Sequence, residues 1–163
     1  MRSVAVDMLQ RVDYWIIGFL RTINLPAARG TIFVVFFWFG LLKVVATSPA
    51  NPLVAELLGR TLPFVTFNQF IIGFGIYEMM IGVIFLIPGL ERLAIALLVP
   101  HMATTFLPLI VTPAMTWQSF MVPTLEGQYI IKNLVIIAAA IAIAAHLHPL
   151  KGVKAESESK EIF

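Results

Sequence analysis

Four long apolar runs dominate the chain, and each is long enough to cross a membrane. They cover residues 26–47, 68–87, 93–111 and 128–145. A spanning helix needs about 20 predominantly apolar residues, and consecutive spans joined by short connections pack antiparallel. The pattern therefore predicts an all-α integral membrane protein. We expect one domain, residues 1–150, built as an antiparallel up-down four-helix transmembrane bundle.

A different pattern precedes the first run. Residues 3–24 have apolar positions at helical spacing on one side and polar positions mostly on the other. Asn24 and Pro26 are typical of a helix start. We therefore expect a separate amphipathic helix in the cytoplasmic membrane interface, the alternative being a fifth helix packed against the bundle. At the other end, the charged residues 151–163 predict a flexible cytoplasmic tail.

Two long connections separate the runs. The first contains the apolar residues 52–58, which predict a short helix closed by Gly59. The second, residues 112–127, has the character of a loop, with Trp117 and Phe120 as expected interface anchors.

Composition and charge agree with the membrane class. The chain has 163 residues, of which 60% are hydrophobic and 12% charged, against about 45–50% and 25% in soluble domains. The net charge of +2 is too small to indicate nucleic-acid binding. Placing both termini in the cytoplasm puts eight of the eleven Lys and Arg residues on that side, so the distribution predicts this orientation. The chain has no cysteine, so we expect no thiol redox chemistry and no iron–sulfur centre.

Glu78 is the most unusual residue in the apolar runs. A charge at the bilayer centre costs about 2.5–3.5 kcal/mol on insertion scales, so such a residue needs a partner. At a rise of about 1.5 Å per residue, Lys43 and Lys132 fall in the outer half within reach of Glu78, and His101 falls at its depth. We interpret the group as a candidate ligand-binding or proton-relay site. A structural ion-pair network is an equal alternative.

Further polar residues flank these positions. The secondary candidates are Thr104, Thr105 and Asn133. Because His101 follows Pro100, we expect its ring to bond a carbonyl freed by the proline rather than a metal. His146 and His148 lie about 15 Å lower by the same rise, so the spacing predicts neither an internal haem nor another metal site.

Four short motifs occur in order along the chain. They are FFWFGLLKV at 36–44 with SPANPLV at 48–54, IYEMMIGVIFL at 76–86, ATTFLPLIVTP at 103–113, and EGQYIIKNLVIIAAA at 126–140. In these motifs the chain resembles the DoxX-like family of small bacterial membrane proteins. It is most similar to the branch containing an inner-membrane protein linked to reactive-chlorine resistance. The likeness extends from Thr31 to Ala145, although Asn133 replaces an acidic residue and the first loop is shorter.

The resemblance implies a role and a location. It implies a subunit in the bacterial inner membrane that acts in redox metabolism or oxidant defence, with Lys43, Glu78 and Lys132 as the family's recurring polar positions. A quinone or a small anion is the implied ligand. The implied partners, besides the lipid bilayer, are a redox protein that carries electrons or further copies of the chain. Two alternatives stay open: a non-catalytic assembly protein, and a small-solute or proton-coupled transporter acting as an oligomer.

Overall fold

The protein is almost entirely helical. The computed structural model describes residues 2–149, with side chains from residue 6 onward, so the predicted tail at 151–163 lies outside the described residues. The helices are α1 (Arg2–Val44), α2 (Asn51–Thr61), α3 (Phe67–Leu86), α4 (Glu91–Phe106), α5 (Pro108–Val111), α6 (Pro113–Thr116) and α7 (Leu125–Ala144). Strands β1 (Trp117–Ser119) and β2 (Val122–Pro123) form an antiparallel hairpin between α6 and α7.

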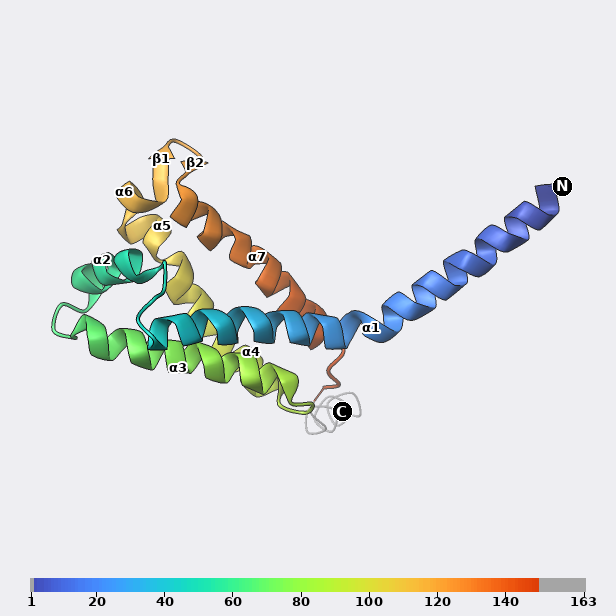
Figure 1. Cartoon of the computed structure of the whole chain (residues 1–163), viewed down its shortest axis with the longest axis horizontal. Coiled ribbons are helices and arrows are strands. Elements are labelled where there is room, and N and C mark those ends of the chain that lie inside the picture. Colours follow the sequence, from blue (N-terminus) through green and yellow to red (C-terminus); the bar gives the residue numbers. More distant parts are fainter. Residues whose placement is uncertain (1, 150–163) are drawn as a thin grey trace, which may run out of the picture.

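Four helical segments are long and apolar enough to cross a membrane. They are Val6–Val44, Phe67–Leu86, Glu91–Val111 and Leu125–Ala144. The predicted helical membrane class is therefore confirmed, with each predicted run falling within or close to one of these segments. In the bundle α1 contacts α3 and α7, and α4 contacts the same two helices (Figure 1).

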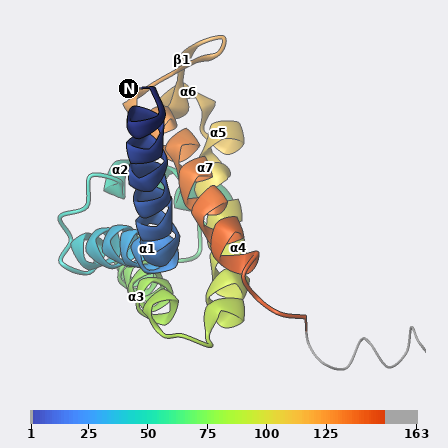
Figure 2. The ribbon, with the colours of Figure 1, turned by 90° about the vertical axis from the view of Figure 1, so that its right-hand side faces the viewer.

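The N-terminal region differs from the prediction. α1 is one continuous helix of 43 residues with Pro26 in its interior, so the separate helix ending at residue 24 is wrong. Proline within a helix removes one backbone hydrogen bond and bends the axis, and here it does not end the helix. Figures 1 and 2 show the N-terminal part of α1 extending away from the bundle, and the described residues 6–20 are exposed. The alternative of a fifth helix packed on the bundle is thus not observed.

The closest helix contact lies between α1 and α3. A Cβ atom added to Gly40 would lie 2.6 Å from the Gly75 carbonyl oxygen, and one added to Gly75 would lie 2.6 Å from the Gly40 oxygen. One added to Gly82 would lie 3.1 Å from the carbonyl oxygen of Phe33. The three glycines therefore let the two backbones touch, as small residues do between membrane helices. The contacts pair later residues of α3 with earlier residues of α1, so these two helices run antiparallel.

The apolar core lies inside the ring of four helices. Its buried members come from α1, α3, α4 and α7: Ile32, Phe36, Ile81, Phe85, Ala94, Leu98, Met102, Ala140 and Ile143. Each helix thus buries a stripe of large side chains and leaves the rest of its apolar surface outward. This is the pattern expected of a bundle surrounded by lipid.

The two long connections, between α1 and α3 and between α4 and α7, lie at the end of the bundle opposite the exposed part of α1 (Figure 1). α2 runs past Gly59, so the predicted stop there is wrong. The second connection, residues 112–127, is not a simple loop either, because it contains α6, the hairpin and the start of α7. Trp117 is held by a hydrogen bond from its Nε1 to the Leu109 carbonyl (3.0 Å), whereas Phe120 at the hairpin tip is exposed.

Candidate functional site

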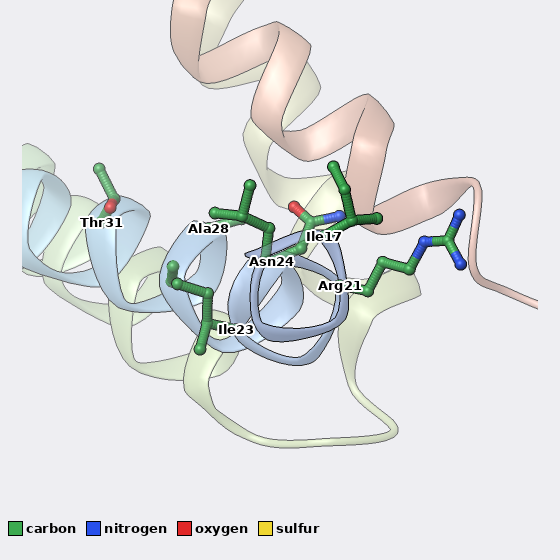
Figure 3. A pocket seen from close by; sticks show the side chains of 8 residues that line it. Ile17, Arg21, Ile23, Asn24, Ala28 and Thr31 are labelled. Carbon is green, nitrogen blue, oxygen red and sulfur yellow. The ribbon is translucent and has the colours of Figure 1, made fainter. Parts of the chain in front are cut away.

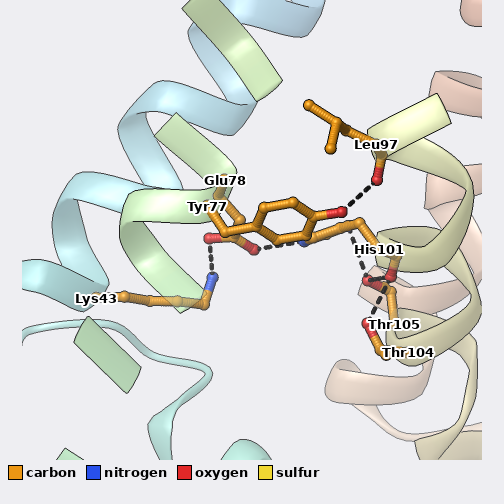
Figure 4. Close-up of polar contacts among 7 residues, drawn as sticks. All are labelled: Lys43, Tyr77, Glu78, Leu97, His101, Thr104 and Thr105. Carbon is orange, nitrogen blue, oxygen red and sulfur yellow. Dashed lines mark hydrogen bonds and ion pairs between the residues drawn. The ribbon is translucent and has the colours of Figure 1, made fainter. Parts of the chain in front are cut away.

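Glu78 is buried between a lysine and a histidine from different helices. Its Oε2 accepts a hydrogen bond from Lys43 Nζ at 2.6 Å, and its Oε1 lies 2.9 Å from His101 Nε2 (Figure 4). All three side chains are at most 8% exposed. We call Lys43, Glu78 and His101 the triad. It joins α1, α3 and α4 at one point inside the bundle.

The glycine contact places two members of the triad. Lys43 follows Gly40 by three residues on α1, and Glu78 follows Gly75 by three residues on α3. Residues three apart lie on the same side of a helix. Because the helices are antiparallel, Lys43 and Glu78 lie on either side of the contact between Gly40 and Gly75. Side chains tilt toward the N-terminus of their own helix, so both lean back toward the contact and meet there. The local sequence thus builds the ion pair from two small residues and two charged ones.

Hydroxyl groups surround the histidine on α4. Thr105 Oγ1 lies 3.3 Å from His101 Nδ1 and donates to the His101 carbonyl at 2.9 Å, while Thr104 Oγ1 donates to the same carbonyl at 2.8 Å. A carboxylate only accepts hydrogen bonds, so Nε2 carries the proton that faces Glu78. A threonine hydroxyl can donate one hydrogen bond and can also accept. Thr105 Oγ1 can therefore accept from Nδ1 when that nitrogen carries a proton, or donate to it when it does not.

Aromatic rings enclose the triad. Phe74 stacks on the His101 ring at a centroid distance of 5.1 Å and an interplanar angle of 8°, and Phe36 meets the same ring edge-on at 5.0 Å. Lys43 Nζ lies 5.6 Å from the Phe74 ring centroid, within cation–π range. The rings exclude water from the charges, which strengthens the electrostatic interactions among them.

Tyr77 binds the α4 backbone close to Pro100. Its hydroxyl donates to the Leu97 carbonyl at 2.5 Å (Figure 4), one residue after the carbonyl of Ala96 that loses its helical donor at the proline. The prediction that His101 bonds a freed carbonyl through its ring is wrong, because the ring binds Glu78. Tyr77 was not identified from the sequence. Its place directly before Glu78 and opposite Pro100 was the available signal.

The other predicted residues lie outside the triad. Lys132 Nζ lies 5.3 Å from the centroid of the Tyr129 ring and makes no ion pair within residues 6–149. Asn133 Nδ2 donates to carbonyls of its own helix, those of Tyr129 at 3.0 Å and Ile130 at 3.2 Å. The expected pairing of Glu78 with Lys43 is present, and the expected contribution of Lys132 is not. A flexible side chain near a helix end has solutions other than reaching inward.

A second ion pair was missed by sequence reasoning. Arg29 on α1 pairs with Glu91 at the start of α4, and both side chains are largely buried. The sequence did contain a signal for this pair. Arg29 is the single arginine in the apolar run 26–47, and Glu91 is the single carboxylate after the short turn that follows the run 68–87. The pair joins α1 at Arg29 to the start of α4. The triad joins α1 at Lys43 to α3 and α4.

A groove lies at the bend of α1, away from these ion pairs. It is lined by α1 residues alone, among them Arg21, Asn24, Ala28 and Thr31 (Figure 3). None of its lining residues belongs to the triad, so it is not an entrance to that site. Within the part of the chain that the structure describes, no three His, Cys, Asp or Glu side chains are grouped to hold a metal ion.

The chemistry of the triad rests on its own residues. Comparisons with protein-family models, with curated proteins and with solved structures find no match to this chain. A carboxylate, an imidazole and an ammonium at hydrogen-bond distance can exchange protons and can hold an oxygen-bearing or anionic group. Because water is largely excluded, such a group would interact strongly with the Lys43 charge.

Proposed function

We propose that the chain is a DoxX-like subunit of the bacterial inner membrane that acts in redox metabolism or oxidant defence. In this proposal the triad holds a quinone-like head group or a small anion and exchanges a proton with it. The observation that carries the proposal is Glu78, whose two oxygens are shared between Lys43 and His101 in a buried, aromatic-walled position. Intramembrane ionisable residues commonly mark substrate or proton pathways.

The unused hydrogen-bonding capacity of Lys43 supports a ligand. An ammonium has three donors, and Lys43 makes one hydrogen bond within the described residues, that to Glu78. The other donors suit a quinone carbonyl or an anion. His101 suits the proton step, because Thr105 can act as either donor or acceptor toward Nδ1.

The proposal includes a membrane arrangement. The four spans run up and down in sequence, with both termini in the cytoplasm. The ring of contacts among α1, α3, α4 and α7 supports the first point, and the bias of Lys and Arg toward the proposed cytoplasmic side supports the second. Electrons reach the ligand from a partner protein, or the ligand is shared between copies of the chain.

A thermal-shift experiment tests the ligand. A ligand at about 100 times its dissociation constant stabilises the folded state by about 2.7 kcal/mol. The purified protein would be titrated with a short-chain quinone analogue and, separately, with inorganic anions. We expect one class to raise the melting temperature of the native protein and of Lys132→Gln, but not of Lys43→Gln or Glu78→Gln. If neither class shifts the native protein, the proposal fails.

A second function is favoured by a specific observation. Both oxygens of Glu78 have partners, and the pair lies one turn from the closest helix contact. This favours a non-catalytic assembly protein in which the triad only fixes helix register. That function predicts that Glu78→Gln lowers stability while every ligand leaves the native protein unshifted.

A further inference from the structure

The part of α1 outside the bundle, which we call the arm (residues 6–24), has an uncovered apolar side. Its large side chains, exposed by 49–70%, are Met8, Leu9, Val12, Trp15, Phe19 and Leu20. At 3.6 residues per turn these positions fall within little more than a third of the helix circumference. Asp7, Arg11 and Arg21 lie on the opposite side. This apolar side is therefore exposed, and nothing among the described residues 6–149 covers it.

Part of the apolar side of the arm continues the outward side of the bundled part of α1. Residues 18 apart are separated by five full turns and lie on the same side. Leu20 is thereby aligned with Trp38, and both are exposed. Tyr14 is aligned with Ile32, which is buried at 1% exposure in the bundle core. Met8 and Leu9 are aligned with the exposed Pro26 and Ala27, whereas Trp15 and Phe19 are aligned with the half-buried Phe33 and Phe37 beside α3. The apolar side of the arm therefore overlaps the outward side of the span and ends at the edge of its contact with α3.

We propose that the apolar side of the arm binds the lipid surface of the bilayer at the head-group and acyl-chain boundary. The bundled part of α1, from Leu25 to Val44, has 20 residues, or about 30 Å at the helical rise. That length matches the hydrocarbon core of a bilayer, so the arm starts where the core ends. The outward side of the span, which faces the acyl chains, overlaps the apolar side of the arm at this level.

Two details of the arm fit binding to the lipid surface. The Trp15 and Phe19 rings stack in parallel, with centroids 5.9 Å apart and an interplanar angle of 7°, and aromatic residues favour the boundary depth. Arg21 and Asn24 line the groove at the bend (Figure 3), at the level of the head groups in this placement. The inference is independent of the triad and of any ligand it holds.

Depth-dependent fluorescence quenching tests the proposal with adjacent residues. Trp38→Phe and Trp117→Phe leave Trp15 as the single tryptophan. Adding Trp15→Phe and Tyr14→Trp moves the probe by one residue to the polar side. In vesicles of lipids brominated near the head group, we expect quenching of Trp15 to be at least twofold stronger than quenching in the Tyr14→Trp variant. Equal quenching of the two probes, or none, would overturn the proposal.

Cysteine labelling provides a second test that needs no tryptophan replacement. The native chain has no cysteine, so Gly18→Cys and Phe19→Cys each introduce a unique thiol. The two positions are about 100° apart around the helix, with Phe19 within the apolar side and Gly18 outside it. We expect a membrane-impermeant maleimide to label Gly18→Cys at least fivefold faster in open vesicles, and both thiols at similar rates after unfolding. Equal rates in vesicles would overturn the proposal. Protection of Phe19→Cys without bromolipid quenching of Trp15 would assign the surface to a second copy and also overturn it.

Discussion

The ion pair between Lys43 and Glu78 predicts strong energetic coupling, which a double-mutant cycle measures. The two charged atoms are 2.6 Å apart and the side chains are 6% and 8% exposed. Lys43→Met leaves Glu78 with His101 as its remaining partner, whereas Glu78→Gln leaves Lys43 without a countercharge. Removing one partner of a buried pair costs about 3–5 kcal/mol because the other charge stays desolvated.

The size of the coupling follows from the state of the double variant. Lys43→Met/Glu78→Gln removes both charges and retains side chains of similar volume. Its free energy of unfolding should therefore fall by no more than that of the worse single variant. Contacting residues show interaction energies of about 0.5–3 kcal/mol, and for this buried pair we expect the upper part of that range, at least about 2 kcal/mol.

Reversible unfolding in detergent, followed by tryptophan fluorescence, measures these free energies. The exposed pair Arg60 and Glu56, joined at 2.7 Å on one face of α2, provides the matched control. Exposed pairs of this spacing contribute about 0.3–0.5 kcal/mol. Additive effects for Lys43→Met and Glu78→Gln, or a coupling no larger than that of the control pair, would refute the geometry of the triad.

Three further substitutions, one of them with a matched control, test the packing of the fold. Gly75→Val should destabilise the protein by about 1–3 kcal/mol or more, because its Cβ would lie 2.6 Å from an α1 backbone oxygen, whereas Gly73→Val, with nothing within 4 Å of its Cβ, should leave the melting temperature nearly unchanged. Arg29→Gln should lower the melting temperature clearly, because it leaves the buried Glu91 carboxylate without its ion-pair partner. Gly127→Ala should disturb the fold near the hairpin, since its Cβ would lie 2.1 Å from an α6 backbone oxygen, and faster proteolysis at the hairpin would report it.

The sequence was sufficient for the spans and for part of the site. Each span has its own apolar pattern, and Glu78 stands out because a carboxylate within such a run needs a partner. Depth along a helix follows from the rise per residue, so Lys43 and His101 were found at compatible levels. Depth does not determine the direction of a side chain around the helix axis, and Lys132 therefore could not be excluded.

The remaining features depend on how the helices touch. The contact between Gly40 and Gly75 sets the register of α1 against α3. The two glycines lie on different helices and belong to no repeated small-residue motif within either helix, so the sequence carried no signal for this contact. Asn24 and Pro26 are typical of a helix start, yet both lie inside a continuous helix, and the backbone angle of proline is compatible with one. The hairpin after α6 was missed because its strands are only three and two residues long.

The role of Glu78 in the living cell is the most direct test of the proposed function. Glu78→Gln would be expressed in a bacterial strain lacking its own copy, at a membrane abundance matched to that of the native protein, and survival after oxidant exposure would be compared. Glu56→Gln, on the exposed face of α2, serves as the control. We predict that Glu78→Gln loses the protection that the native protein and Glu56→Gln provide. Undiminished protection by Glu78→Gln at matched abundance would contradict a functional triad.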